Sequence, residues 1–159
     1  GTILRGVELS GMDLTGTILR EADLSYKDLT GATLIGTDLS YANLRGVDLS
    51  GRDLTGIILI GVDLSGTDLT DTILTNANLE NAILTDSKLL DANLSHANLT
   101  NADLTGALLV DTNLENAILR EADMTGAILT GAILTGADLE NAVLTNAILN
   151  CVGHPICIE

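Results

Sequence analysis

The sequence contains no phenylalanine and no tryptophan, and Tyr26 and Tyr41 are its only aromatic residues. The core of a 159-residue globular domain normally uses large aromatic side chains, so a broad mixed core is excluded here. No run of about eighteen apolar residues is present, so no segment is expected to insert into a membrane. The interior is therefore expected to be narrow and uniform.

Basic residues are also scarce. Seven lysines and arginines stand against 22 aspartates and glutamates, which gives a formal net charge of −15 at pH 7. This charge argues against binding nucleic acid or an anionic membrane. It is compatible with a basic protein partner, with cations or with solubility alone.

Leucine, in contrast, is abundant and occurs at a spacing of five residues. Counting in fives from Leu4 to Leu149 gives 30 positions, all of them leucine except Met124. Alanine stands two residues before this position in 16 of the 30 units, Asp, Asn or Ile usually stands one before it, and Ser or Thr usually follows it. A repeat this strict is typical of a solenoid.

Each five-residue unit predicts one side and one corner of a coil. The three residues that end at leucine alternate inward, outward and inward, as in a very short strand. The next two complete a tight turn, where Gly, Asn and Asp tolerate a positive φ. Four sides close a square coil of about 20 residues, so the chain predicts about seven and a half coils in a rod roughly 36 Å long.

The stretches ADLTG (102–106), ANLSH (92–96) and ANLTN (97–101) resemble the motif A(D/N)LXX of the pentapeptide repeat family. The resemblance covers residues 2–150 and implies an all-β fold, a right-handed quadrilateral parallel β-helix. We therefore expect a β-helix over residues 1–150 and a C-terminal cap or tail over residues 151–159. The family is especially abundant in cyanobacteria and implies no common activity. Some of its members resemble duplex DNA in shape and charge and inhibit DNA gyrase.

Residues 20 apart are expected to share one column on one face of the rod. One column begins with an acidic ladder, which comprises Glu8, Asp28, Asp48 and Asp68. Stacked like charges about 5 Å apart are unfavourable. The ladder is interpreted either as a surface for a basic partner or a cation, or as carboxylates that bond the local backbone at the corners.

The same column continues through Lys88 into apolar residues. With two neighbouring corner residues, these form a candidate partner surface that consists of Leu90, Leu108, Val110, Ile128 and Ile148. One interpretation is docking or dimerisation. The other is that β-branched residues are present only because they suit a strand.

Lys27 and Arg52 occupy the inward position that alanine usually fills. A charge buried without a partner is costly, and a long side chain can carry its charged end outside. We expect both side chains to reach out past the corner and to widen the coil locally.

The tail, CVGHPICIE, holds the only proline and the only two cysteines. Because the end of a solenoid must be capped, Val152, Ile156 and Ile158 are expected to plug it.

Cys151 and Cys157 have three interpretations. They form a disulfide, remain free thiols, or join His154 in a C-x2-H-x2-C arrangement of zinc ligands, for which only Glu159 is near as a fourth. We expect no metal site. Localisation is open between the cytoplasm and export to a periplasm or thylakoid lumen, and a disulfide would favour export.

Catalytic signals are weak. The sequence has two histidines, His96 and His154, and its regularly repeated glycines and hydroxyl residues mark neither a phosphate-binding loop nor a single nucleophile. We expect no enzymatic activity and no cofactor. Since the chain starts at Gly1 and not at methionine, we expect a processed protein or a domain of a longer one.

The sequence therefore predicts a non-enzymatic scaffold that presents rigid β faces to another protein or to its own copy. The alternative is an acidic DNA mimic that inhibits a DNA-binding enzyme such as gyrase.

Overall fold

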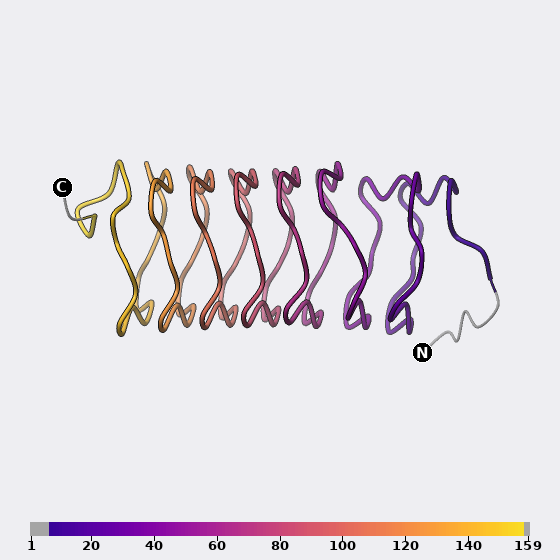
Figure 1. Cartoon of the computed structure of the whole chain (residues 1–159), viewed down its shortest axis with the longest axis horizontal. Coiled ribbons are helices and arrows are strands. Elements are labelled where there is room, and N and C mark those ends of the chain that lie inside the picture. The colour runs from indigo at the N-terminus through magenta and orange to yellow at the C-terminus, as the bar shows by residue number, and fades with distance from the viewer. Residues whose placement is uncertain (1–6, 158–159) are drawn as a thin grey trace.

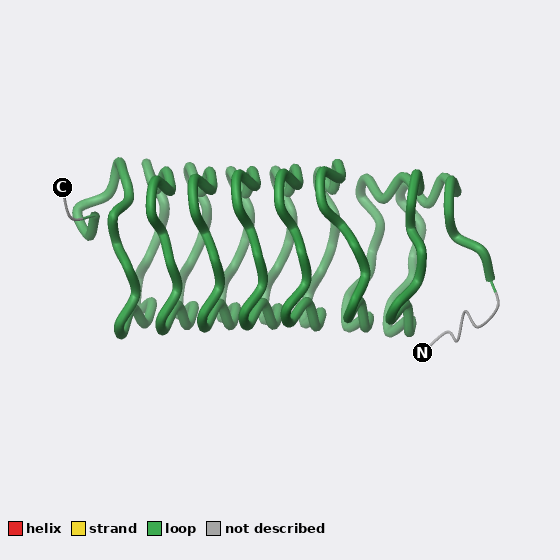
Figure 2. The backbone as a smooth tube through the Cα atoms, in the orientation of Figure 1, coloured by secondary structure: helices red, strands yellow, loops and turns green. Residues whose placement is uncertain are grey.

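The chain folds into a rod of stacked coils in a computed structural model that describes residues 7–157 (Figure 1). The two ends of the described chain lie at opposite ends of the rod. Residues 7–157 contain no helix, and their β pairing consists of isolated bridges without any longer strand (Figure 2). No segment of this part of the chain therefore forms a helix that could cross a membrane.

Parallel bridges set the register of the coils. They join residues that lie 20 apart, as Asp103 joins Asp123 and Leu108 joins Ile128, except at the last bridge, where Ile133 joins Val152. In a complete pair, the N–H of Leu109 donates to the carbonyl oxygen of Ile128 at 2.7 Å, and the N–H of Ile128 donates to the carbonyl oxygen of Ala107 at 3.0 Å. The columns expected from the sequence are the columns of the structure, while the number of coils and their handedness stay predictions.

The corners lie at the second residue after each leucine, where φ is positive. Asn81 has a φ of 57° and Asp91 a φ of 55°. Each corner is closed by a turn in which the next N–H donates to the leucine carbonyl, as Ala82 does to Leu79 at 3.0 Å. Asn, Asp and Gly dominate this position because they enter the left-handed region at the lowest cost.

The core is a column of stacked leucines along the rod axis. From Leu24 to Leu134, every fifth residue is buried, including Met124. The inward alanines between them are also buried. Four inward threonines donate their hydroxyl groups to leucine carbonyls, as Thr112 does to Leu89 at 2.6 Å, whereas the buried hydroxyl of Thr67 has no partner within residues 7–157. Leucine and small side chains fill this narrow core, so no large aromatic side chains are needed.

The C-terminal tail leaves the coil after Val152, which still pairs with Ile133. Val152 does not plug the end of the core: it is 56% exposed, because it takes the outward, bridging position of its column. Ile156 and Cys157 pack against the core instead. Ile158, the third expected plug, lies outside the described residues.

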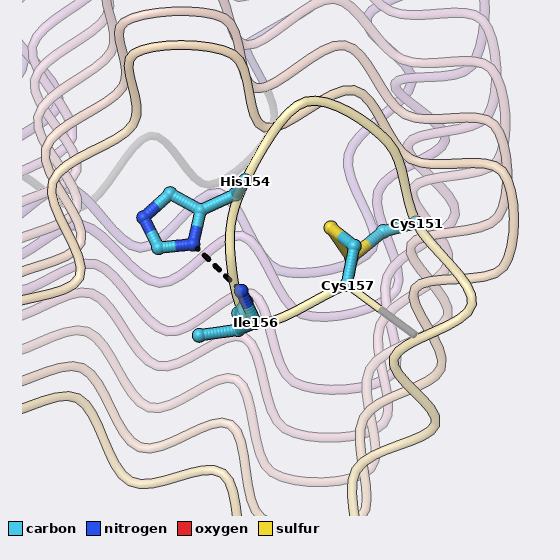
Figure 3. Close-up of a disulfide and its surroundings, with 4 residues drawn as sticks. All are labelled: Cys151, His154, Ile156 and Cys157. Atoms are coloured by element: carbon cyan, nitrogen blue, oxygen red, sulfur yellow. Dashed lines mark hydrogen bonds between the residues drawn. A yellow bond between two sulfur atoms is a disulfide. The ribbon is translucent and has the colours of Figure 1, made fainter. Parts of the chain in front are cut away.

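Cys151 and Cys157 form a disulfide with their Cα atoms 4.9 Å apart (Figure 3). Their loop is closed by the Ile156 N–H, which donates to Nδ1 of His154 at 3.3 Å. The interpretations as free thiols and as zinc ligands are therefore wrong, because the two sulfur atoms bond each other. Glu159 lies outside the described residues.

Candidate functional site

One face of the rod carries both the acidic ladder and the apolar residues, and we call it the mixed face. Continuous bridges run along its column from Asp68 through Lys88 and Leu108 to Ile148. Within the described residues, no bridge joins Asp28 to Asp48 or Asp48 to Asp68. The mixed face is thus paired in its C-terminal half and unpaired in its N-terminal half.

The C-terminal half brings the five predicted partner residues together. Leu108, Ile128 and Ile148 stack on successive coils, and Ile148 is 51% exposed. Leu90 and Val110 lie beside this column at neighbouring corners of adjacent coils, both half-buried. We call these five residues the apolar patch.

Other exposed isoleucines have polar neighbours on the adjacent coils, and within residues 7–157 only Ile133 has an apolar neighbour in its column, Val152. Ile118, which is 40% exposed, stacks between Asn98 and Asp138. No other column in residues 7–157 places three apolar side chains in succession at the outward position. The apolar patch is therefore a local property of the mixed face.

The carboxylates of the acidic ladder bond the local backbone, as the second interpretation predicts. Oδ1 of Asp28 accepts from the N–H of Thr30 at 2.8 Å, and Oδ1 of Asp48 accepts from the N–H and the hydroxyl group of Ser50 at 3.0 and 2.6 Å. Hydrogen bonds from Thr30 and Ser50 favour the ionised forms and lower the pKa of Asp28 and of Asp48. Both carboxylates are exposed and charged at neutral pH.

The two ends of the ladder are held in the same local manner. Oε1 of Glu8 accepts from the hydroxyl group of Ser10 at 2.9 Å. Oδ1 of Asp68 accepts from the N–H of Thr70 at 3.1 Å, and in addition its Oδ2 pairs with Nζ of Lys88 on the next coil at 3.3 Å. This ion pair lies where the continuous pairing of the mixed face begins.

On the mixed face, backbone hydrogen bonds are missing between the coils that carry Asp28 and Asp48, although other sides of the same coils are paired, as Leu24 is with Asn43 at 3.0 Å. The N–H groups of Leu29, Gly31 and Asp48 make no hydrogen bond within residues 7–157. On the same face, the equivalent N–H groups of Leu109 and Ile128 are paired. The two coils have therefore separated along this side.

Two inward cations lie at the opened part of the rod. Nζ of Lys27 donates to the carbonyl oxygen of Val7 at 3.2 Å, and Nη1 of Arg52 donates to that of Ala32 at 3.1 Å. In a complete ladder, those oxygens would accept from the backbone N–H groups of residues 28 and 53. The expected path past the corner is wrong: both side chains turn between the coils, where a carbonyl group accepts a hydrogen bond from each, and both are half-buried. The local widening of the coil itself stays a prediction.

The separation leaves a cleft of about 350 Å³, which we call the coil cleft. It is lined by Tyr26, Lys27, Asp28, Leu29, Thr30, Gly46, Asp48, Ser50 and Arg52. The coils lose their regular spacing in the same N-terminal part of the rod (Figure 1). Charge at the inward position predicted a wider coil, and nothing else in the sequence pointed to this cleft.

Comparison with protein families then identifies the repeat. Eight copies of the pentapeptide repeat match, within residues 19–51, 53–86, 87–126, 107–146 and 127–152. The chain belongs to the pentapeptide repeat family. No curated protein sequence matches this pentapeptide repeat protein.

Several solved structures resemble this pentapeptide repeat protein. Full-length QnrB1, a plasmid-mediated fluoroquinolone resistance protein, is 18% identical, with 93% of this chain and 80% of QnrB1 covered and a TM-score of 0.61. This likeness shows a shared fold.

Two cyanobacterial pentapeptide repeat proteins are more similar in sequence. HetL, involved in heterocyst differentiation regulation in Nostoc sp. strain PCC 7120, is 28% identical, with 97% and 94% of the two chains covered and a TM-score of 0.24. Rfr23 from Cyanothece 51142 is 29% identical, with 91% and 90% covered and a TM-score of 0.26.

Proposed function

We propose that this pentapeptide repeat protein is a non-enzymatic scaffold that binds another protein, or a second copy of itself, along the mixed face. The apolar patch is the observation that carries the proposal. Its three stacked members, Leu108, Ile128 and Ile148, form an unbroken apolar run on a surface where other outward isoleucines have polar neighbours. Leu108 and Ile128 are half-buried and Ile148 is exposed, and contiguous apolar surface that is open to solvent in this way is typical of a docking site.

The rod suits such a role mechanically. Around the apolar patch, backbone hydrogen bonds hold each coil to the next, as between Leu109 and Ile128 at 2.7 Å. A partner therefore meets a surface that is already ordered and loses little affinity to its ordering. The acidic half of the same face favours a partner whose opposing surface is apolar at one end and basic at the other.

A pair of double variants tests the proposal. Leu108→Asp with Ile128→Asp should abolish the pull-down of a partner, or dimerisation measured by light scattering. The control, Ile73→Asp with Ile118→Asp, adds the same charge at outward positions that are 42% and 40% exposed in other columns, and it should keep the interaction. An unchanged partner profile and oligomeric state in the first variant would contradict the proposal.

A second candidate function is inhibition of a DNA-binding enzyme, such as gyrase, by an acidic surface that imitates duplex DNA. Local hydrogen bonds favour this candidate. Hydrogen bonds from Thr55 lower the pKa of Asp53, just as local hydrogen bonds lower the pKa of Asp28 and Asp48 on the mixed face. Aspartates on different faces of the rod therefore stay ionised. About 36 Å of B-DNA carries roughly 21 charges, and this chain has a net charge of −15. Inhibition of DNA supercoiling at micromolar protein is the expected result, and full supercoiling activity would contradict this candidate.

The disulfide bears on location. We infer that the protein works in an oxidising compartment, because the Cys151–Cys157 bond persists only where thiols are not kept reduced. Thiol counting on protein isolated from its source cells tests this. No free thiol is expected, and two free thiols would contradict the inference.

A further inference from the structure

We propose that the coil cleft receives an arginine side chain from an extended segment of the protein partner. The guanidinium group binds the backbone carbonyls that the separated coils leave unpaired. This inference rests on the proposed function and deepens it, because it specifies the chemistry of the partner at the acidic end of the mixed face.

The cleft presents free backbone groups from both of its walls. Three carbonyl groups and three N–H groups line the cleft without a hydrogen bond within residues 7–157, although the equivalent groups of other coils are paired. They are the carbonyls of Lys27, Asp48 and Ser50 and the N–H groups of Leu29, Gly31 and Asp48. Unpaired backbone donors and acceptors form favourable hydrogen bonds with a partner that offers both kinds of group. A peptide segment with an arginine side chain offers both, since its guanidinium donates and its own carbonyls accept.

The protein itself shows that a guanidinium fits between two coils. Arg52 places its side chain next to the cleft and donates to the carbonyl oxygen of Ala32, in place of a backbone N–H. Lys27 does the same to Val7 with an ammonium group. A second guanidinium in the cleft would repeat this contact at the carbonyls that remain free, and its planar shape suits the space between two strands.

Charge favours a cation over an anion in the cleft. Asp28 and Asp48 line it, and each uses Oδ1 in a local hydrogen bond with the residue two positions later. The two cations of the cleft, Lys27 and Arg52, already donate to carbonyl oxygens. The net charge of −15 draws basic segments towards the rod, and carboxylates beside free carbonyls make charge-assisted hydrogen bonds to arginine.

The first test compares two double variants of equal charge. The probe is a fluorescein-labelled nine-residue peptide in which arginine alternates with threonine, and its binding is followed by fluorescence anisotropy at physiological salt. Asp28→Asn with Asp48→Asn should weaken binding about tenfold. The control, Asp103→Asn with Asp123→Asn, removes the same charge from a stacked pair in a closed part of the rod and should leave binding within about twofold. Equal losses in both variants would overturn the proposal.

The second test separates the cleft from general electrostatic attraction. Lys27→Ala with Arg52→Ala restores the small inward residue and lets the coils close, but it makes the protein more negative by two charges. Closure predicts binding about tenfold weaker, whereas general attraction predicts stronger binding. Unchanged or stronger binding would overturn the proposal, and so would tighter binding of a matching glutamate–threonine peptide to the unaltered protein.

These results are distinguishable from a failure of the proposed function. The probe peptide has no large apolar residue and does not report on the apolar patch. If Leu108→Asp with Ile128→Asp leaves partner binding intact, the scaffold proposal fails while the cleft result stands. If the peptide ignores the cleft, the docking role of the apolar patch is unaffected.

Discussion

Nη1 of Arg52 lies 3.1 Å from the carbonyl oxygen of Ala32, where a complete coil would place the N–H of Asp53. Lys27 has the same relationship to Val7, also 20 residues back. In both cases a cation at the inward position is kept out of the leucine column and takes over a backbone hydrogen bond. Both cations line the coil cleft, on the side of the solenoid where the backbone pairing is interrupted.

The corner positions predict a clear difference between two substitutions at Asn81, whose φ is 57°. Asn81→Val places a β-branched side chain in the left-handed region and should lower the free energy of unfolding by about 1–2 kcal/mol. Asn81→Gly should change it by less than about 0.5 kcal/mol, because glycine adopts this conformation freely. Urea unfolding measures both. Equal effects would show that the corner does not constrain φ.

Asp13 predicts an acid dependence of stability. Its Oδ1 accepts from the hydroxyl group of Thr33 at 2.7 Å on the next coil, and this bond, with those from Thr15, lowers the pKa of Asp13 from 3.8 to about 2. Because the pKa is lower in the folded state, the stabilisation is present above pH 3.8 and is lost as the pH falls towards 2.

Urea unfolding of the unaltered protein and of Asp13→Asn should therefore differ most near pH 5 and converge near pH 2. Asparagine keeps the shape of the side chain and cannot titrate, so it serves as the matched control. A difference that stays constant across this range would contradict the assignment.

The disulfide predicts a modest stabilisation of the C-terminal end. Cys151 and Cys157 are separated by six positions, and closing so short a loop stabilises by about 2 kcal/mol. Cys151→Ala with Cys157→Ala should lower the melting temperature, and reduction of the unaltered protein should lower it by a similar amount. A melting temperature insensitive to reduction would show that the bond does not hold the tail on the core.

Much of the fold could be predicted from the sequence because its period is strict. Leucine at every fifth residue fixes the inward column, and Asn, Asp or Gly two residues later fixes the corner. The five residues of the apolar patch fall together, as expected, because any two residues 20 apart share a column. In a regular solenoid, the spacing of two residues in the sequence is enough to predict their relative positions on the rod.

The departures from the period could not be placed in the same way. Lys27 and Arg52 indicated a widened coil. A cation at the inward position of the repeat is, however, compatible with two side-chain paths, one past the corner and one between the coils. The choice depends on which carbonyl group lies within reach, which is a three-dimensional property. Val152 was misplaced for a similar reason: the backbone pairing continues one residue out of step and turns its side chain outward.

Arg20 and Asp38 show what the column analysis overlooked. Nε of Arg20 lies 2.5 Å from Oδ2 of Asp38, and Arg120 repeats the contact with Asp138 at 2.6 Å. Both pairs are 18 residues apart and lie diagonally across neighbouring coils. A search for opposite charges at that spacing would have found them, whereas a search at 20 residues does not.

Amide hydrogen exchange of the unaltered protein, resolved by residue in NMR spectra, tests the central claim most directly. The comparison is between Leu29, Gly31 and Asp48, which face the coil cleft, and their equivalents Leu109, Asp111 and Ile128, which are paired on the same face. We predict that the first three amides exchange at least about tenfold faster than the second three. Equal protection of the two sets would mean that the backbone pairing continues through Lys27 and Arg52, and that there is no cleft.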